Sequence, residues 1–240
     1  MALFDTPCHL DDPRFDADRD DVVARAAAAG LAGMLVPGVL EAQWPSLRRL
    51  AETHGLRFGV GTHPQNLPVS RAVPTDLDGA SAIGECGLDG PTPVPMDDQE
   101  RVLHAHLALA RESGLPVILH CFRAHHRMVP VLQRWAPVRG VMHSYSGGPE
   151  LVDIYTALGL HISFAGAVTW ETARKPVAAL LRVPLHRLLA ETDGPDQCPR
   201  PCRGRSEPSY LGHIVDAMER LRGEDVRGVL LENVRSLGWL

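Results

Sequence analysis

Short apolar runs alternate with longer amphipathic stretches along the whole chain, and this alternation constrains the fold more than any other feature of the sequence. Short runs of aliphatic and β-branched residues are typical of buried strands. Strands that alternate with helical stretches predict a parallel sheet, because each helix returns the chain to the same edge. The eight predicted strands are Ala2–Thr6, Gly33–Pro37, Arg57–Gly61, Ala82–Glu85, Val117–His120, Gly140–His143, His161–Ala165 and Leu188–Thr192.

The stretches between these runs carry the periodicity and the end signals of helices. Asp18–Ala29 is rich in alanine and begins with acidic residues, which favour a helix N-terminus. Asp97–Ser113 has apolar residues at helical spacing and is followed by Gly114, a residue typical of helix C-termini. Helices are also predicted for Glu150–Leu158 and Pro208–Leu221, and the proline-rich Thr62–Ala80 is predicted to be irregular.

Eight strand–helix units in a chain of 240 residues predict one domain, a single α/β (β/α)8 TIM barrel over residues 1–240. An open sheet of the dinucleotide-binding type would need a glycine-rich loop after its first strand. The residues at that point, Thr6–His9, include no glycine. No linker, repeat or low-complexity segment divides the chain, so the barrel is the simplest prediction.

The charge and the cysteines narrow the possible functions. A net charge of −5 argues against non-specific coating of nucleic acid, so a phosphate substrate has to be held locally, by a metal or a few Arg and His side chains. Five cysteines is an odd number in a chain too large to need disulfides, which favours reduced thiols. Neither a signal peptide nor a membrane-spanning run is recognisable, so we expect a cytoplasmic protein without membrane contact.

Imidazole and carboxylate side chains recur where the predicted strands end. A single histidine at a strand end is more often a structural hydrogen-bonding group than a ligand. Carboxylates are rarely buried unpaired, however, and in a barrel these strand ends all meet at one rim. A divalent metal would neutralise the carboxylates and accept the imidazole lone pairs, and such ligands fit Mg, Mn or Zn. The side chains are His9, His63, Glu85, His120, His143 and Asp193.

The segments around these residues resemble the motifs of the TatD family of metal-dependent deoxyribonucleases. Each segment alone is a weak signal, but six in the same order, over nearly the whole chain, are strong. Two further segments also fit the resemblance: Arg203–Arg205 before Glu207, and a C-terminal helix over Asn233–Leu237. The six motifs are Phe4–Asp11, Gly61–Pro64, Ile83–Asp89, Gly114–His120, Gly140–Gly147 and Leu188–Asp193.

The resemblance implies a role for each candidate residue. Glu85 would bridge two divalent metals, and His120 and His143 would hold one of them. Asp193 would hold the other together with an HxH pair on the first strand, and would help to deprotonate the attacking water. His63 would contact the substrate phosphate. The two ions would polarise the phosphate and stabilise the leaving oxygen.

Two departures from the family pattern affect these expectations. Pro7 stands where the first histidine of the HxH pair would be, so only His9 remains, and strand alternation turns Cys8 away from their shared side. One metal site is therefore expected to be short of a ligand and weak. After His120 the family commonly has an arginine two residues on, where this chain reads Phe122-Arg123. The phosphate-binding arginine has either shifted to Arg123 or been lost.

The sequence thus predicts a hydrolase that cleaves phosphodiester bonds of DNA, as an exonuclease, with water activated at a centre of one or two divalent ions. DNA, single-stranded or at an end, is the expected partner, and no obligate protein partner is evident. Two alternatives stay open. The same barrel could hydrolyse a small amide, lactone or phosphoester, or it could be catalytically impaired and serve as a binding subunit, an option that Pro7 keeps open.

Several conspicuous residues are assigned ordinary roles. Cys198 and Cys202 are interpreted as loop thiols rather than zinc ligands, because no second pair follows them. Cys8, Cys86 and Cys121 adjoin proposed ligands and are expected to pack behind the site. His125 and His126, on the helix predicted to follow the fifth strand, are expected to be solvated. The basic loop residues Arg200, Arg203 and Arg205 fit a solvated loop and contact with a DNA backbone about equally well.

Overall fold

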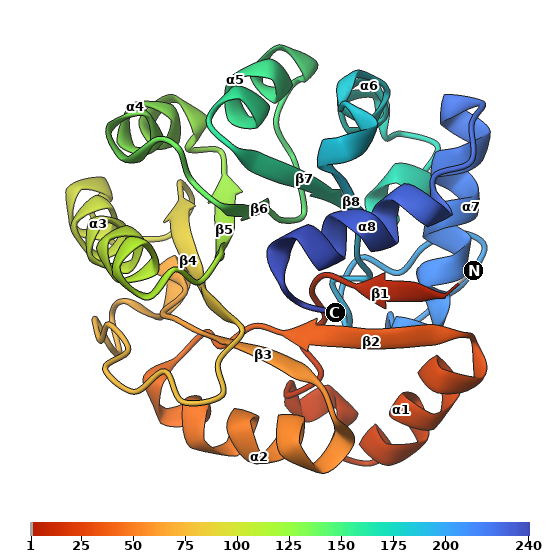
Figure 1. Ribbon diagram of the computed structural model, residues 1–240, viewed down its shortest axis with the longest axis horizontal. Coiled ribbons are helices and arrows are strands. Elements are labelled where there is room, and N and C mark those ends of the chain that lie inside the picture. Colours follow the sequence, from red (N-terminus) through yellow and green to blue (C-terminus); the bar gives the residue numbers. More distant parts are fainter. Residues whose placement is uncertain (1) are drawn as a thin grey trace.

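The computed structural model describes residues 2–240 and shows eight parallel strands that pair in chain order around a barrel, with helices outside them (Figure 1). This confirms the predicted (β/α)8 architecture and all eight predicted strands. The strands are β1 Leu3–Asp5, β2 Leu31–Val36, β3 Arg57–Val60, β4 Ala82–Asp89, β5 Val117–Phe122, β6 Gly140–Met142, β7 Leu160–Phe164 and β8 Leu188–Ala190.

Two strand ends differ from the prediction in a way that matters for the site. β4 continues to Asp89 and β5 to Phe122, so Glu85 and His120 lie within strands and not at their ends. The part of β4 that was not predicted pairs with the end of β5, from Cys86 opposite Leu119 to Asp89 opposite Phe122. The polar and glycine-containing sequence after Glu85 does not read as a strand, but this pairing keeps it extended.

The helices pack around the barrel, and in the described residues none is long and apolar enough to cross a membrane. Two of them were not predicted. Trp44–His54 and Arg174–Arg182 each have a proline in the first turn, where proline is tolerated but interrupts the sequence pattern of a helix. The helices are α1 Arg19–Ala28, α2 Trp44–His54, α3 Met96–Ser113, α4 His125–Trp135, α5 Val152–Ala157, α6 Arg174–Arg182, α7 Leu211–Arg222 and α8 Arg227–Leu237.

The strands are apolar on both faces because each face is buried against a different partner. Alternate strand residues such as Ile83, Leu119 and Met142 belong to the large cluster that also includes the inner faces of the helices. Their neighbours form a second cluster inside the barrel, which includes Ile118 and Val141. The continuous apolar runs of the sequence are therefore explained by burial on both sides.

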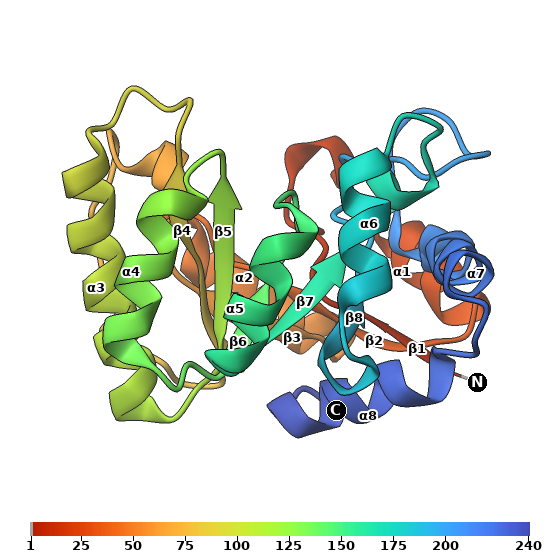
Figure 2. The ribbon, with the colours of Figure 1, turned by 90° about the horizontal axis from the view of Figure 1, so that it is seen from above.

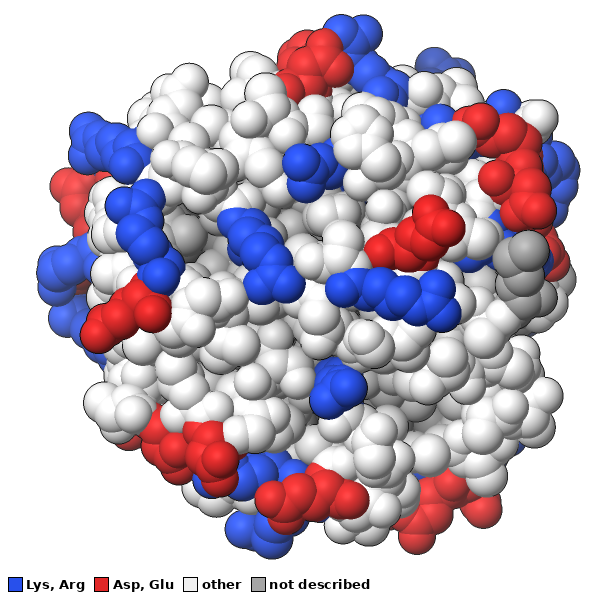
Figure 3. Space-filling view, viewed as in Figure 1, with Lys and Arg blue, Asp and Glu red and all other residues white. Residues whose placement is uncertain are grey.

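One end of the barrel is closed by the last helix. α8 lies across the ends at which the strands begin, on the side opposite to their arrowheads (Figure 2). Trp239, directly after α8, is fully buried in the inner cluster, and its Nε1 donates to the carbonyl of Ser81 just before β4. The space-filling view of this end shows a filled surface on which Lys and Arg side chains lie near the middle (Figure 3). The opposite end, at which the strands finish, is not covered by α8 (Figure 2).

Side chains join β8 to β1, between which no strand pairing is assigned in the described residues. The carboxylate of Asp5 accepts hydrogen bonds from the backbone N–H and the hydroxyl of Thr192, at 2.7 and 2.5 Å. The hydroxyl of Thr6 donates to the carbonyl of Ala190 at 3.0 Å. These bonds hold the segments after β1 and β8 side by side, which brings His9 close to Asp193.

Candidate metal centre

The six histidine, glutamate and aspartate residues singled out in the sequence meet at the open end of the barrel. They line one cavity of about 610 Å³. Arg123 is not among its lining residues: its guanidinium is exposed and lies 5.2 Å from the centroid of the Phe122 ring. The six lining residues are His9, His63, Glu85, His120, His143 and Asp193.

An irregularity in β4 directs Glu85 into the cavity. The pairing of β4 with β5 shifts register between Ile83 and Cys86, as in a β-bulge, which re-aims a side chain. Gly84, inside this shift, has a φ of +137°, and a Cβ there would lie 2.5 Å from the carbonyl oxygen of Ile118. Only glycine fits this position. The Gly-Glu pair in the sequence is thus the local cause of the buried carboxylate.

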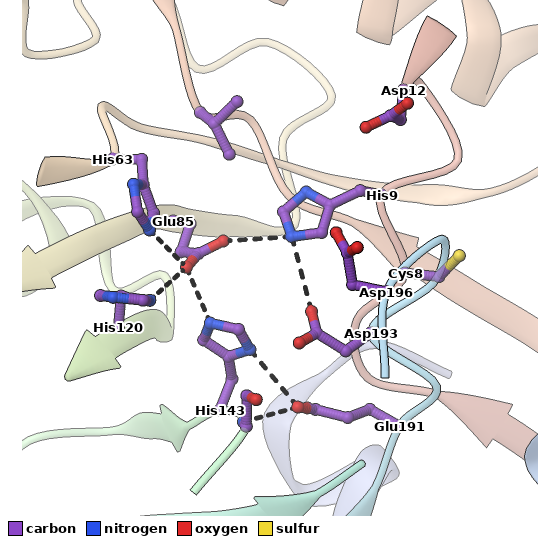
Figure 4. A network of polar contacts seen from close by, with 12 residues as sticks. Cys8, His9, Asp12, His63, Glu85, His120, His143, Glu191, Asp193 and Asp196 are labelled. Carbon is purple, nitrogen blue, oxygen red and sulfur yellow. Dashed lines mark hydrogen bonds and ion pairs between the residues drawn. The ribbon is translucent and has the colours of Figure 1, made fainter. Parts of the chain in front are cut away.

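The carboxylate of Glu85 is surrounded by imidazole nitrogens, one from β5 and three from the segments after β1, β3 and β6 (Figure 4). Its Oε1 lies 2.7 Å from Nε2 of His143, 3.1 Å from Nδ1 of His120 and 3.2 Å from Nε2 of His63. Its Oε2 faces Nε2 of His9 at 3.4 Å. One fully buried carboxylate therefore stands at the centre of four imidazoles.

The donor atoms of this centre fit a divalent cation. Oε2 of Glu85 is buried and has no hydrogen-bond partner, although burial of such an oxygen is costly when nothing compensates it. The potential ligand atoms form two sets, and within each set all the atoms lie within 4.8 Å of one another. The sets are His63–Glu85–His120 and His143–Glu191–Asp193. Imidazole nitrogens and carboxylate oxygens are ligands that Zn²⁺ and Mn²⁺ accept, and carboxylates suit Mg²⁺.

Two buried carboxylates face the outer ring nitrogens of His120 and His143, and the sequence analysis predicted this role for neither of them. Asp89 Oδ2 lies 3.1 Å from Nε2 of His120, so Nδ1 of His120 faces Glu85. Glu191 Oε1 lies 3.4 Å from Nδ1 of His143, so Nε2 of His143 faces Glu85. An outer carboxylate that holds one ring nitrogen leaves the other free to bind a metal. The two histidines thus offer different nitrogens to the same centre.

The charges of Glu85 and the surrounding imidazoles shift one another's pKa. Burial alone would raise the pKa of Glu85, but the imidazoles of His143 and His63 hold it well below its usual value. Burial lowers the pKa of His143, but Glu85 overrides that effect and raises it well above the usual value. Burial lowers the pKa of His63 and raises that of Glu191 to about 7. Protons on imidazole therefore balance the charge of Glu85, and a cation that binds there displaces them.

Asp193 approaches the centre from the segment after β8. It has a φ of +51°, and its N–H donates to the carbonyl of Pro7 at 3.2 Å. Its carboxylate accepts a hydrogen bond from Gln197 at 2.5 Å and lies 3.6 Å from Nε2 of His9. Its side chain is 13% exposed, whereas that of Glu85 is 2% exposed. Of these two carboxylates, Asp193 is the one that solvent and substrate reach.

The side of the cavity beside His9 is poor in free ligands. Pro7 is buried, does not line the cavity and offers only its carbonyl. The nearby carboxylates of Asp12 and Asp196 both accept hydrogen bonds from Arg14, at 2.9 and 2.8 Å. Their charges are therefore already compensated, and His9 belongs to neither set of potential ligand atoms.

The remaining cysteines and histidines lie mostly where the sequence placed them. Cys8, Cys86 and Cys121 are buried, and burial raises their pKa. Cys8 and Cys86 pack behind the cavity as expected, whereas Cys121 is part of its lining. The expectation that His125 is solvated was wrong. It is half-buried, its Nδ1 lies 2.8 Å from the hydroxyl of Tyr155, and burial lowers its pKa to about 4.

Comparison with known proteins identifies the family. The model of the TatD related DNase family matches residues 4–237. A protein of Pantoea sp. (strain At-9b) named 3'-5' ssDNA/RNA exonuclease TatD is 38% identical over 240 residues, with 92% of each chain covered. A protein of the same name from Klebsiella pneumoniae (strain 342) is 37% identical, with 98% of this chain and 97% of the relative covered.

Solved structures agree with this result. A TatD homologue from Escherichia coli K12 superposes with a TM-score of 0.91 at 30% identity, covering 98% of this chain and 97% of the homologue. An organophosphorus hydrolase variant from Deinococcus radiodurans, with a TM-score of 0.65 at 15% identity, shares the fold. The resemblance seen in the sequence is confirmed: the chain belongs to the TatD family of DNases and is a metal-dependent hydrolase.

Proposed function

We propose that the protein is an exonuclease that removes nucleotides from the 3' end of single-stranded DNA or RNA. The name of its relatives supports this activity, since proteins 37–38% identical to the chain are named 3'-5' ssDNA/RNA exonucleases. The observation that carries the proposal is the carboxylate of Glu85, buried among four imidazoles with one oxygen unbonded, at the base of a 610 Å³ cavity.

In this proposal the chain holds one or two divalent ions through the residues around Glu85. Glu85, His120 and His143 would hold one ion, and Glu85, His9 and Asp193 would hold the other. Bound divalent ions would supply Lewis-acid activation of a phosphodiester and lower the pKa of water to near neutrality. Mg, Mn and Zn are all compatible with this set of nitrogen and oxygen donors.

The chain's own residues orient the reactants. Asp193 is more accessible than Glu85, so it takes the proton of the attacking water. The hydrogen bond from Gln197 fixes the position of the Asp193 carboxylate. His63, which lines the cavity next to His120 at a ring separation of 4.3 Å, contacts the phosphate of the nucleotide to be removed. Arg123 would reach that phosphate only by leaving the Phe122 ring.

The test is the variant Glu85→Gln, which keeps the size of the side chain and removes its charge. We expect metal-dependent shortening of a labelled single-stranded oligonucleotide to fall by at least about 100-fold, because the centre loses its shared charged ligand. The circular dichroism spectrum should stay unchanged. Glu112→Gln, an exposed glutamate of α3, is the matched control and should retain full activity.

Three other outcomes would change the assignment. Wild-type turnover in Glu85→Gln would show that hydrolysis does not use this centre. Hydrolysis of small phosphoesters with intact oligonucleotides would favour a small-molecule hydrolase. No turnover by the wild type with Mg²⁺, Mn²⁺ or Zn²⁺ would favour a catalytically impaired binding subunit.

A further inference from the structure

The exposed aromatic side chains of this protein are confined to one place. The chain has twelve Phe, Trp and Tyr residues, and in the described part of the chain only Phe122 and Trp170 are strongly exposed, each at 39%. Both line the cavity that holds Glu85. Single exposed apolar residues are common on protein surfaces, but two aromatic rings at the mouth of one polar cavity indicate a binding surface.

Trp170 is held in a fixed position at the edge of the cavity. It follows the 3-10 turn Gly166–Thr169 after β7, and its Nε1 donates to the carbonyl of Cys198 at 3.0 Å. The N–H of Arg200 donates to the hydroxyl of Thr169 at 2.7 Å, which ties the same two loops together. The indole is thus oriented before any ligand arrives, so little conformational entropy is lost on binding.

Trp170 also borders a second hollow. It lines a groove of about 790 Å³ between α6 and α7, so the same ring belongs both to the cavity and to this groove. The groove floor includes apolar residues, among them the exposed Leu181 and Leu221. A chain-like ligand that leaves the cavity past Trp170 would enter the groove.

The groove along this path is lined by positively charged side chains, which can bind phosphates. Arg174, Arg200 and Arg220 line the groove, and none of the three has a carboxylate within ion-pair distance among residues 2–240. Of the two acidic residues in the lining, Asp216 is already paired with Arg227, which leaves Glu171. The groove therefore carries an excess of positive charge, in contrast to the carboxylates of the cavity.

Phe122 has a similar arrangement on another side of the cavity. It ends β5, two strands away from β7 in the barrel order, and Arg123 lies over its ring. An aromatic face beside an arginine is the combination on which unpaired bases stack while their phosphates are bound. Bases inside a duplex cannot use such rings, because their faces are covered by neighbouring bases.

We propose that Trp170 and Phe122 are stacking platforms for unpaired bases, and that the groove between α6 and α7 takes the sugar-phosphate backbone of a single strand beyond the cavity. The inference rests on the proposed function and extends it. It identifies the residues that hold the nucleotides not being cleaved, and these platforms make the enzyme selective for strands without base pairs.

Binding without catalysis tests the platforms separately from the nuclease activity. Fluorescence anisotropy in EDTA compares a labelled thymidine decamer with a decamer of abasic sites, which has the same charge and no bases. Wild-type protein should bind the thymidine decamer about 10-fold or more tightly than the abasic one, and Trp170→Ala should lose most of that difference. Trp170→Phe should keep much of it, because a ring remains.

The controls separate stacking from folding and from charge. Trp135→Ala removes the same kind of side chain from α4, away from the cavity, and should leave the preference for bases intact. Arg174→Ala should weaken both decamers equally, because it removes a phosphate contact. With metal present, Trp170→Ala should raise KM for the decamer about 10-fold and leave kcat within about 2-fold.

The outcomes are distinguishable. Three results would each overturn the proposal that Trp170 and Phe122 are stacking platforms. The wild type could bind the two decamers with equal affinity, or it could bind neither detectably. Alternatively, Trp170→Ala could lose affinity for both decamers equally. Base-dependent binding that is lost in Trp170→Ala, in a protein that cleaves nothing, would support the platforms and contradict the exonuclease instead.

Discussion

Pro7 makes the two sides of the Glu85 carboxylate chemically unequal. On the Oε1 side lie three imidazoles, within 3.2 Å. On the Oε2 side lies His9 alone, and Pro7 contributes no side-chain donor. Because metal affinity depends on the number of ligands and their geometry, an ion beside His9 is expected to bind more weakly than an ion beside His143.

The variant Pro7→His tests this asymmetry. Loss of an outer partner of a ligand costs about 10- to 100-fold in metal affinity, so gain of a direct ligand should tighten the weak site by at least about tenfold. Calorimetric titration of the wild type should resolve one tight and one weak site, and the variant should bring them closer together. The metal concentration needed for oligonucleotide cleavage should fall accordingly.

Pro7→Ala is the matched control, because it removes the proline ring without adding a donor. It should leave the weak site weak. Two equally tight sites in the wild type would contradict the argument, since another group would then have to supply the missing ligand.

At the residue scale, the sequence predicted which side chains gather but not how each one is held. His120 and His143 were recognisable because a polar residue ends an apolar run. The contacts of Asp89 with His120 and of Glu191 with His143 join residues 31 and 48 positions apart in the sequence. Only the barrel brings them together, so the ring nitrogen that faces the centre could not be predicted.

At the scale of elements, α3 is tied to the loop after β3 by a buried histidine. Nε2 of His106 accepts a hydrogen bond from the N–H of Thr62 at 3.2 Å, and its Nδ1 lies 2.9 Å from the carbonyl of Val102. The contact with Thr62 requires an unprotonated Nε2, so the ring is neutral and Nδ1 donates to Val102. Burial lowers the pKa of His106 to about 4, from a usual value of 6.5.

This pKa predicts acid sensitivity with a definite sign. The unfolded chain binds a proton on His106 more readily than the folded chain, so His106 destabilises the fold as the pH falls from about 6.5 towards 4. Its contribution between pH 7.5 and pH 5 is about 2 kcal/mol. His106→Gln keeps an acceptor for Thr62 without a titratable ring. Urea unfolding should therefore show a fall in stability about 2 kcal/mol smaller than in the wild type over that range.

Equal slopes of stability against pH in the two proteins would contradict the assignment. His125 and His161, whose pKa values burial also lowers to about 4, are present in both proteins and cancel in the comparison.

Elements with regular periodicity were predictable, and elements shaped by their neighbours were not. Asp97–Ser113 agrees with α3 to within one residue because its apolar spacing and Gly114 are local signals. The end of β4 at Asp89 and the register shift at Gly84 depend on pairing with β5. A sequence pattern carries no information about that pairing until the partner strand is known.

On the scale of the whole molecule, the residues that close the barrel and the residues of the candidate metal centre lie at opposite ends. The closed end is filled by the inner apolar cluster and by Trp239, whose carbonyl also accepts a hydrogen bond from Arg57. The polar centre lies at the other end. Trp239→Ala should therefore lower the free energy of unfolding by about 3–5 kcal/mol, because it leaves a cavity in a closely packed layer.

At a temperature where Trp239→Ala is still folded, its kcat should stay within about 2-fold of the wild type, because its effect lies at the end away from the site. Thermal unfolding and cleavage assays on the same sample check both parts. A large fall in kcat without a fall in stability would show that the two ends are coupled.

The overall architecture was predictable because eight repeats of one local pattern leave few alternatives. The closure of the ring was not. Asp5 and Thr192 lie 187 residues apart in the sequence, and their hydrogen bonds form only when the first and last strands become neighbours. The proximity of His9 and Asp193 depends on that closure.

The position of α8 also determines how the protein can be attached to other objects. The last residues of the chain lie beneath the barrel, at the ends where the strands begin (Figure 2). The cavity that holds Glu85 is at the other end of the barrel. A bead, an electrode or a fused domain joined at the C-terminus would therefore leave the mouth facing the solution. Single-stranded oligonucleotides of any length could then reach the cavity of an immobilised protein without obstruction by its support.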